Sequence, residues 1–366
     1  MKLLILGSLK EGGVSQHVAS ILSSGIKPYV FDVDGVQVHK SLGLPRKNIK
    51  AIKIYESYFF LPISLFNLHK GVKKYSIKII HAHVLRFGFL AAIYKFFNPQ
   101  IKIVYTPHGC RYFEKKSTLM RWLFKQFEIF VFNTSSKIIF IRKYEYTKLI
   151  NEKVLKPSDT KAKIIYPAFR KDNLLQQNVN EGPIRLVGML GRVYDIKQPL
   201  LFCKSAEILL KEDPNLKFIW GGDGPDLMRI KNYISDKNLN EKIIFTGNLS
   251  GNQLIKFWEQ VDCLMLTSRS EIFPTIVIEA FISKTPVITT NFDGHDELIV
   301  DGHNGLVVNK DNFEQEITSC LHQLKNKELR SKLVYNAYDF YEKKLSNVEY
   351  FHQQHKKIYK EILDDH

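Results

Sequence analysis

Two carboxylates stand at the ends of an almost wholly apolar run. In "SRSEIFPTIVIEAF", residues 268–281, they are Glu271 and Glu279. A buried carboxylate is costly unless it is paired or hydrogen-bonded, so a helix that needs only an apolar face would contain neither. Carboxylates accept hydrogen bonds from sugar hydroxyls, and a helix starting near Pro274 leaves the N–H groups of residues 273–275 open to oxygen ligands. The segment suits a sugar attached to a nucleoside diphosphate; the alternative is a salt-bridged Glu279 and a solvated Glu271.

A basic pair precedes this segment in the chain. In "GMLGRVYDIKQP", residues 188–199, Arg192 and Lys197 directly follow an expected strand and precede a helix that Pro199 would help to start. Arginine offers a planar fork of donors and lysine a point charge, a pairing suited to a diphosphate. The competing interpretation is two solvated charges, and the position after a strand favours the diphosphate.

Two glycine-rich turns also follow expected strands. The first, in "GSLKEGGVSQHV" (7–18), places Gly12 and Gly13 before a helix, where backbone N–H groups and the helix dipole favour an anion. It lacks the Gly-x-Gly-x-x-Gly spacing of a dinucleotide fingerprint, and a tight turn explains it nearly as well. The second, in "WGGDGPDLMRI" (220–230), is predicted to be a structural turn.

Each of these candidate segments requires a strand, a loop and a helix in succession. The sequence contains two series of such strand–loop–helix units. Short apolar runs separated by helical stretches predict parallel sheets covered on both faces, hence an α/β protein with two doubly wound domains, 1–165 and 166–345. The polar, proline-containing segment 150–182 is expected to link them. The expected strands are 2–7, 27–33, 78–83, 101–109 and 136–141, then 184–191, 216–222, 242–247, 262–268, 285–290 and 305–308. Ligands in such sheets bind beyond the carboxyl ends of the strands, where all four candidate segments fall.

The positive charge is confined to one half of the chain. The formal net charge is +16, yet residues 1–165 hold 28 Lys and Arg against 9 Asp and Glu, and residues 166–366 hold 25 against 28. A basic half implies an anionic partner: nucleic acid, a membrane surface or a phosphorylated substrate.

Length and cysteines narrow the class of protein. A chain of 366 residues exceeds what one core comfortably supports, and none of its segments approaches the roughly 20 apolar residues of a membrane span. The apolar run 3–6 is too short for a signal peptide, so a cytoplasmic protein is expected. The four cysteines are far apart, which predicts reduced core thiols and no disulfide or metal site.

In "SEIFPTIVIEAF", the sequence resembles the Glu-(any seven)-Glu motif of retaining glycosyltransferases of family 4. Other segments match the family in order: the Gly-Gly loop, "IIHAH", "TPHG", "GGDGP", "IIFTGNLS" and "GHDELIVDGHNGLVV". The resemblance covers nearly the whole chain and implies a GT-B fold, two Rossmann-like domains facing a cleft. The last segment, 346–366, resembles the terminal helix that crosses back to the first domain.

The resemblance also implies roles for individual residues. Arg192 and Lys197 would bind the donor diphosphate. Glu271 and the backbone of Phe273 and Pro274 would bind the donor sugar. Glu279 would bind the ribose. His108, in "TPHG", would lie near the reacting sugar and Gly13 near the phosphates, whereas His81 and His83 are expected to serve packing. A UDP-sugar is the expected donor, and neither a further cofactor nor a metal is expected. The chain departs from the family pattern at four places: Ile272, "YPAF" (166–169), Arg142 and Gln198.

The first domain of such enzymes takes the acceptor, and here it is the basic one. Segments 55–74 and 110–132 interleave aromatic and basic residues, which suits an anionic membrane surface, although helices packed in a soluble core look alike. The resulting hypothesis is an enzyme at the inner membrane face that acts on a glycan or polyprenyl-diphosphate-linked acceptor in the synthesis of surface polysaccharide. The alternatives are a nucleotide-sugar epimerase of similar fold and, ranked low, a nucleic-acid-binding protein.

Overall fold

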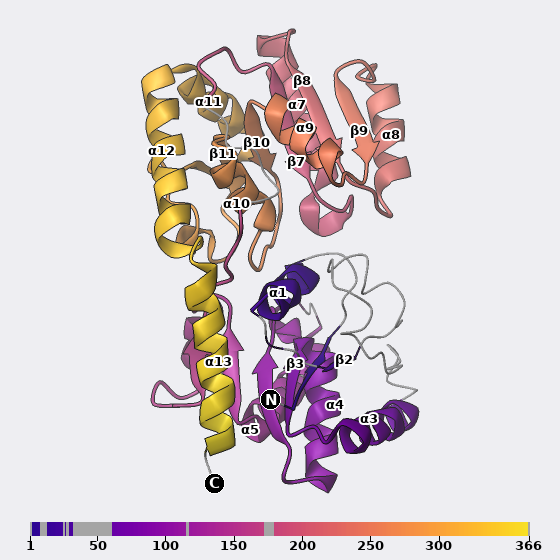
Figure 1. Cartoon of the computed structure of the whole chain (residues 1–366). Coiled ribbons are helices and arrows are strands. Elements are labelled where there is room, and N and C mark those ends of the chain that lie inside the picture. The colour runs from indigo at the N-terminus through magenta and orange to yellow at the C-terminus, as the bar shows by residue number, and fades with distance from the viewer. Residues whose placement is uncertain are drawn as a thin grey trace. The chain divides into compact units, whose positions relative to one another are not determined.

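The computed structural model describes residues 2–7, 13–24, 26, 29–31, 61–114, 117–171 and 179–364. The chain divides into two compact units, shown in Figure 1. Unit 1 comprises Met1–Ala168 together with Asn347–His366, and unit 2 comprises Phe169–Ser346.

Unit 1 is built on a parallel sheet of six strands in the order β2-β1-β3-β4-β5-β6. The register places Leu4 of β1 beside Ile80 of β3, which in turn lies beside Ile103 of β4. The strands are β1 (Leu3–Leu6), β2 (Tyr29–Phe31), β3 (Ile79–His83), β4 (Lys102–Thr106), β5 (Lys137–Phe140) and β6 (Ala162–Ile164).

Helices cover both faces of this sheet, because successive side chains of a strand point to opposite faces. Leu4 and Leu6 belong to a core that contains residues of α3, α4, α5 and α6, whereas Leu3 and Ile5 belong to a core with residues of α1 and α13. The helices of unit 1 are α1 (Gly13–Leu22), α3 (Leu61–Tyr75), α4 (Val84–Phe97), α5 (Thr118–Thr134), α6 (Lys143–Asn151) and α13 (Val348–Asp364), with a short 3-10 turn, η3 (Arg111–Glu114). The last helix of the chain is thus part of the first unit.

Unit 2 repeats the arrangement around one core, with a parallel sheet in the order β12-β11-β10-β7-β8-β9. Its strands are β7 (Leu186–Leu190), β8 (Lys217–Gly221), β9 (Ile243–Gly247), β10 (Cys263–Leu266), β11 (Val287–Thr290) and β12 (Leu306–Val308). Its helices are α7 (Pro199–Glu212), α8 (Leu227–Asp236), α9 (Asn252–Gln260), α10 (Thr275–Ile282), α11 (Phe313–Lys325) and α12 (Lys327–Lys344), with 3-10 turns η4 (Asp195–Lys197) and η5 (His295–Glu297).

These observations confirm the predicted fold class and most of the predicted elements. Each expected strand of the second series contains an observed strand, and Pro199 begins α7 as predicted. All four cysteines are buried and free, as expected of core thiols. In the described part of the chain, none of the helices has the length and apolar character needed to cross a membrane.

The boundary between the two units, after Ala168, falls inside segment 150–182, where a linker was expected, but the segment also contains the unpredicted strand β6. The side chains of this strand are half-buried or exposed, so it lacks the apolar run by which buried strands are found. Four predicted features include residues outside the described part of the chain: the Gly loop at 8–12, the ends of the strand 27–33, and the segments 55–74 and 110–132 at residues 55–60 and 115–116.

Candidate active site

The structure joins one basic and one acidic candidate in unit 2. The Nζ atom of Lys197, at the end of η4, lies 2.5 Å from Oε1 of Glu271, in the loop after β10. Only 16% of the Lys197 side chain and 10% of the Glu271 side chain are exposed. The alternative of a solvated Glu271 is therefore wrong. Both charges lie just beyond the carboxyl ends of neighbouring strands, β7 and β10.

Hydrogen bonds attach these two loops to each other. The hydroxyl of Thr267 donates to the carbonyl of Lys197 at 2.9 Å, and the N–H of Arg269 donates to the carbonyl of Ile196 at 2.8 Å. The guanidinium of Arg269 also pairs with the carboxylate of Asp195, on the exposed side of the same loops. The backbone at η4 is thus fixed independently of the Lys197–Glu271 pair.

Glycines set the path of the loop that carries Arg192. A Cβ on Gly222 would lie 2.0 Å from the carbonyl oxygen of Gly191, and a Cβ on Gly224 would lie 2.2 Å from that of Val193. The turn at 220–230 therefore packs directly on the backbone on either side of Arg192, which is the structural role predicted for it. Arg192 itself is exposed, with its guanidinium 5.7 Å from the ring centre of Tyr194.

The start of α10 follows the prediction in detail. Pro274 stands at the N-cap position, where no side chain caps the helix, and Phe273 stacks on Phe169 with ring centres 6.2 Å apart. Glu279, in the second turn, accepts a hydrogen bond from the indole N–H of Trp258 at 3.2 Å. Burial raises the pKa of Glu279 to about 7, while the Trp258 bond acts in the opposite direction. The salt bridge that the alternative interpretation required of Glu279 is absent from the ion pairs of the described residues.

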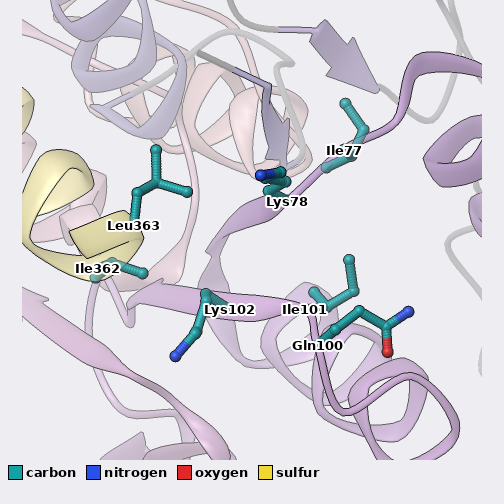
Figure 2. Close-up of a pocket in the computed structure, with 7 residues that line it drawn as sticks. All are labelled: Ile77, Lys78, Gln100, Ile101, Lys102, Ile362 and Leu363. Atoms are coloured by element: carbon teal, nitrogen blue, oxygen red, sulfur yellow. The ribbon is translucent and has the colours of Figure 1, made fainter. Parts of the chain in front are cut away.

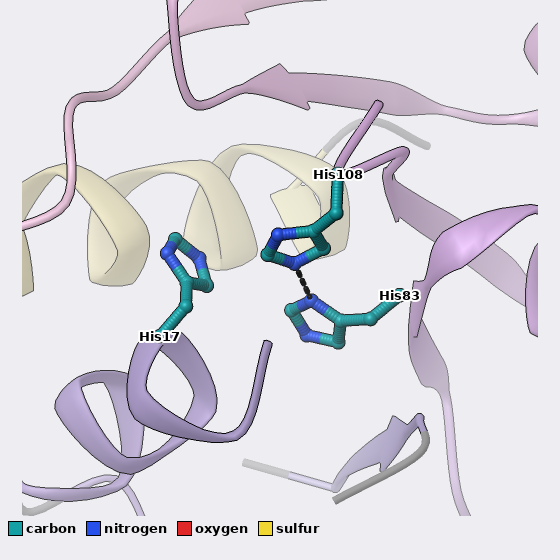
Figure 3. A group of neighbouring side chains, drawn as sticks. All are labelled: His17, His83 and His108. Atoms are coloured by element: carbon teal, nitrogen blue, oxygen red, sulfur yellow. Dashed lines mark hydrogen bonds between the residues drawn. The ribbon is translucent and has the colours of Figure 1, made fainter. Parts of the chain in front are cut away.

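In unit 1, the candidate His108 belongs to a group of buried histidines. Nε2 of His108, after β4, lies 2.9 Å from Nδ1 of His83, at the end of β3. His17 on α1 faces both, with its ring centre 5.0 Å from that of His108 (Figure 3). Burial lowers the pKa of His108 to about 3, so its imidazole is neutral at physiological pH. Gly13, the exposed first residue of α1, would carry a Cβ with no described atom within 4 Å.

A buried carboxylate supports the loop that carries His108. Glu128 of α5 accepts hydrogen bonds from the hydroxyl of Tyr105 and, at 3.3 Å, from the N–H of Arg111. Burial raises the pKa of this carboxyl to about 8, although the Tyr105 bond opposes the shift. His108 has a left-handed backbone with φ of 51°, which is uncommon outside glycine, and the bonds of Glu128 hold the chain on both sides of it.

Sequence reasoning missed Thr267, Trp258 and His17, whose roles depend on partners far away in the chain. It placed His81 correctly among packing residues, since both ring nitrogens of His81 are hydrogen-bonded, to Tyr359 and Thr106. Among the described residues, His17, His83 and His108 form the one group whose ligand atoms could surround a metal ion. No metal site was expected at these positions.

A pocket of unit 1 lies at the end of its sheet opposite to His83 and His108. Its lining comes from the opposite ends of β3 and β4 and from the last turn of α13, as Figure 2 shows. It consists of Ile77, Lys78, Gln100, Ile101, Lys102, Ile362 and Leu363. Because doubly wound sheets bind ligands at the carboxyl ends of their strands, this pocket is not the expected nucleotide site.

Comparison with known proteins agrees with this geometry. Residues 12–170 match the family model Glycosyltransferase Family 4, and residues 170–340 match the model Glycosyl transferases group 1. The chain is a glycosyltransferase of the GT-B type. Of the three functions raised by the sequence, the matched models favour the transferase over the epimerase and the nucleic-acid-binding protein.

Alignments with individual proteins extend over most of this glycosyltransferase. It is 27% identical to an uncharacterized glycosyltransferase of Methanocaldococcus jannaschii, over 96% of this chain and 95% of that protein. It is 24% identical to the UDP-Gal:alpha-D-GlcNAc-diphosphoundecaprenol alpha-1,3-galactosyltransferase of Escherichia coli, over 74% of each. Its fold is similar to that of Anabaena HepE, solved in complex with UDP and glucose, with a TM-score of 0.81, 17% identity and coverage of 99% and 100%.

Proposed function

We propose that this glycosyltransferase moves a hexose from a UDP-sugar to an acceptor hydroxyl with retention of the anomeric configuration. The observation that carries the proposal is the Lys197–Glu271 pair, held by two loops at adjacent strand ends. A cation that can reach a phosphate and a carboxylate that can reach a sugar hydroxyl lie there side by side. A bond between them keeps both in place before the donor arrives, which reduces the cost of ordering them on binding.

In the proposed reaction, the bond between the anomeric carbon and the leaving diphosphate breaks while the acceptor oxygen bonds to the same face of that carbon. The acceptor proton passes to the leaving diphosphate. Arg192 and Lys197 stabilise the negative charge that builds on this group, so the proposal requires no metal ion. Glu271 and the backbone of Phe273 and Pro274 orient the sugar, and Glu279 accepts a hydrogen bond from the ribose.

We also propose that two candidates of unit 1, His108 and Gly13, contact the donor. A neutral imidazole such as that of His108 exchanges hydrogen bonds with a sugar hydroxyl without adding charge next to the anomeric carbon. No described atom lies within 4 Å of the position of a Cβ on Gly13, at the start of α1, which suits the approach of a phosphate to backbone N–H groups.

For the acceptor, we propose a glycan linked to a polyprenyl diphosphate, used in the synthesis of surface polysaccharide at the cytoplasmic face of the membrane. Two observations support it: the Escherichia coli relative is named for a diphosphoundecaprenol acceptor, and unit 1 exposes large apolar side chains beside basic ones. On α5, these are Leu119, Met120 and Trp122, next to Arg121 and Lys125.

The proposed site is tested by replacing each member of its ion pair. Lys197→Ala and Glu271→Ala should each lower kcat/KM for sugar transfer by at least about a hundredfold, because each removes a contact to the donor. Asp195→Asn is the matched control: it breaks the exposed pair with Arg269 on the same two loops and should keep near wild-type turnover.

The assay combines purified chain, candidate donors and a lipid-linked acceptor, and it measures release of nucleoside diphosphate. A preceding screen by thermal stabilisation with UDP-, GDP- and ADP-sugars selects the donor. Nuclear magnetic resonance of the product reads its anomeric configuration. Wild-type rates in both alanine variants would remove the site assignment, and a product of inverted configuration would refute retention.

A further inference from the structure

Five buried imidazoles gather at one end of the sheet in unit 1. They come from α1, from β3, from the loop after β4 and from α13, and some neighbouring rings have centres as close as 4.2 Å. The residues are His17, His81, His83, His108 and His355. Burying a polar ring costs free energy unless its nitrogens find partners. Packing alone would be served better by an apolar side chain.

The hydrogen bonds divide these histidines into two kinds. His81 uses both of its ring nitrogens, at 2.7 Å to Tyr359 and 2.8 Å to Thr106, and so has a complete structural role. His17 is different: it is only 3% exposed, and neither of its nitrogens has a hydrogen-bond partner among the described residues. In that same part of the chain, Nε2 of the fully buried His83 also lacks one.

The rings of His17, His83 and His108 converge. One ligand atom from each of His17, His83 and His108 lies within 4.8 Å of the others, and Figure 3 shows the three rings brought together from three separate elements. In a tetrahedral zinc site, Zn–N distances of about 2.0–2.1 Å place the nitrogens roughly 3.3 Å apart. The 2.9 Å between Nδ1 of His83 and Nε2 of His108 is a little shorter, so these two rings would move slightly apart when an ion replaces their hydrogen bond. His17, which has a ring nitrogen within 4.8 Å of this pair, would move inward to complete the set.

We propose that His17, His83 and His108 form a binding site for one divalent ion of the zinc class. Three neutral imidazoles with no carboxylate suit Zn²⁺, Co²⁺, Ni²⁺ or Cu²⁺, whereas Mg²⁺ and Ca²⁺ require oxygen ligands. The set leaves a fourth coordination position for water or a hydroxyl. An ion bound there occupies a nitrogen of His108 and slows sugar transfer; this consequence, unlike the binding itself, rests on the proposed function.

Co²⁺ is the probe for the site, because a tetrahedral set of nitrogen ligands gives it strong visible absorption. The whole chain is stripped with a chelator and titrated with Co²⁺. We expect the absorption to saturate at one equivalent, to disappear on addition of Zn²⁺ and to be unaffected by excess Mg²⁺. Absence of the band in the wild-type chain would overturn the proposal.

Two variants locate the ion. His17→Leu removes a ligand but no described hydrogen bond, so the metal-free variant should melt no lower than the wild type while its Co²⁺ affinity falls at least about tenfold. His303→Gln removes an exposed histidine of unit 2 and should change nothing. An unchanged Co²⁺ titration in His17→Leu, or its loss in His303→Gln, would show binding at the surface and contradict the site.

The consequence for activity is measured separately. Zn²⁺ should inhibit the wild-type enzyme at the concentration at which it displaces Co²⁺, and His17→Leu should resist that inhibition. If Zn²⁺ binds at the three histidines without inhibition, the metal site stands and the assignment of His108 to the reaction is wrong.

Discussion

At the scale of single residues, the two glutamates that bound one apolar segment have opposite surroundings. Glu271 lies against the ammonium of Lys197, which offsets the cost of taking its charge out of water. Glu279 has the uncharged indole N–H of Trp258, and burial raises its pKa to about 7. Two residues of one type in one motif therefore lie in different electrostatic surroundings.

This difference predicts how stability depends on pH at Glu279. Because its pKa rises from 4.5 to about 7 on folding, the folded state holds a proton more tightly, and the residue makes the protein progressively less stable as the pH rises through that range. Glu279→Gln should therefore match the wild type near pH 5 and exceed its free energy of unfolding by about 2 kcal/mol at pH 8. Urea denaturation at the two pH values measures this. A variant equally destabilised at both values would contradict the raised pKa.

At the scale of elements, loops of unit 2 position the charged side chains by backbone contact. The turn after β8 lies against residues 191–193, and hydrogen bonds from Thr267 and Arg269 hold η4 against the loop after β10. Neighbouring parallel strands bring these loops together although the chain separates Lys197 from Glu271 by 74 residues. The positions of Arg192, Lys197 and Glu271 thus depend on backbone contacts between the loops that carry them and their neighbours.

A methyl group added at Gly224 should disturb the contact between the turn after β8 and the backbone of Val193. Gly224→Ala would place a carbon 2.2 Å from the carbonyl oxygen of Val193, so we expect donor affinity to fall at least about tenfold and unfolding to become easier by about 2 kcal/mol or more. Gly302→Ala is the control, because its surroundings are open although its φ of 67° adds backbone strain of about 1 kcal/mol. Calorimetric titration with the selected nucleotide measures the affinity. Equal effects of the two variants would show that the close contact is unimportant.

At the scale of the whole molecule, the excess of positive charge lies in residues 1–165. The exposed apolar side chains of α5 lie in the same half of the chain. A surface with both properties should bind anionic lipid, and its binding should weaken as salt screens the charges.

This expectation is tested with vesicles. The wild-type chain should sediment with vesicles containing phosphatidylglycerol at low salt and much less at high salt. Trp122→Ser, which removes an apolar side chain that is 56% exposed, should reduce binding severalfold. Tyr335→Ser, which removes a 71% exposed side chain of α12 in unit 2, should have no effect. A chain that stays in the supernatant at low salt would refute membrane binding.

Several properties of this protein follow from its sequence alone. Continuous apolar runs predict buried parallel strands, because both faces of such strands are covered, and these runs locate every strand of the two sheets except β6. Pro199 and Pro274 mark the starts of α7 and α10, because proline fits the first turn of a helix. The rule that ligands bind beyond the ends of parallel strands then selects Lys197 and Glu271 as candidates.

Only the tertiary structure decided which of these groups meet. The ion pair of Lys197, the indole partner of Glu279 and the contact of His17 with His83 and His108 all join residues from separate elements. Local patterns cannot contain such pairs, because they depend on strand order and on the face that each helix turns to its sheet. The edge strand β6 was found only in the structure, because its three residues are half-buried or exposed and form no continuous apolar run.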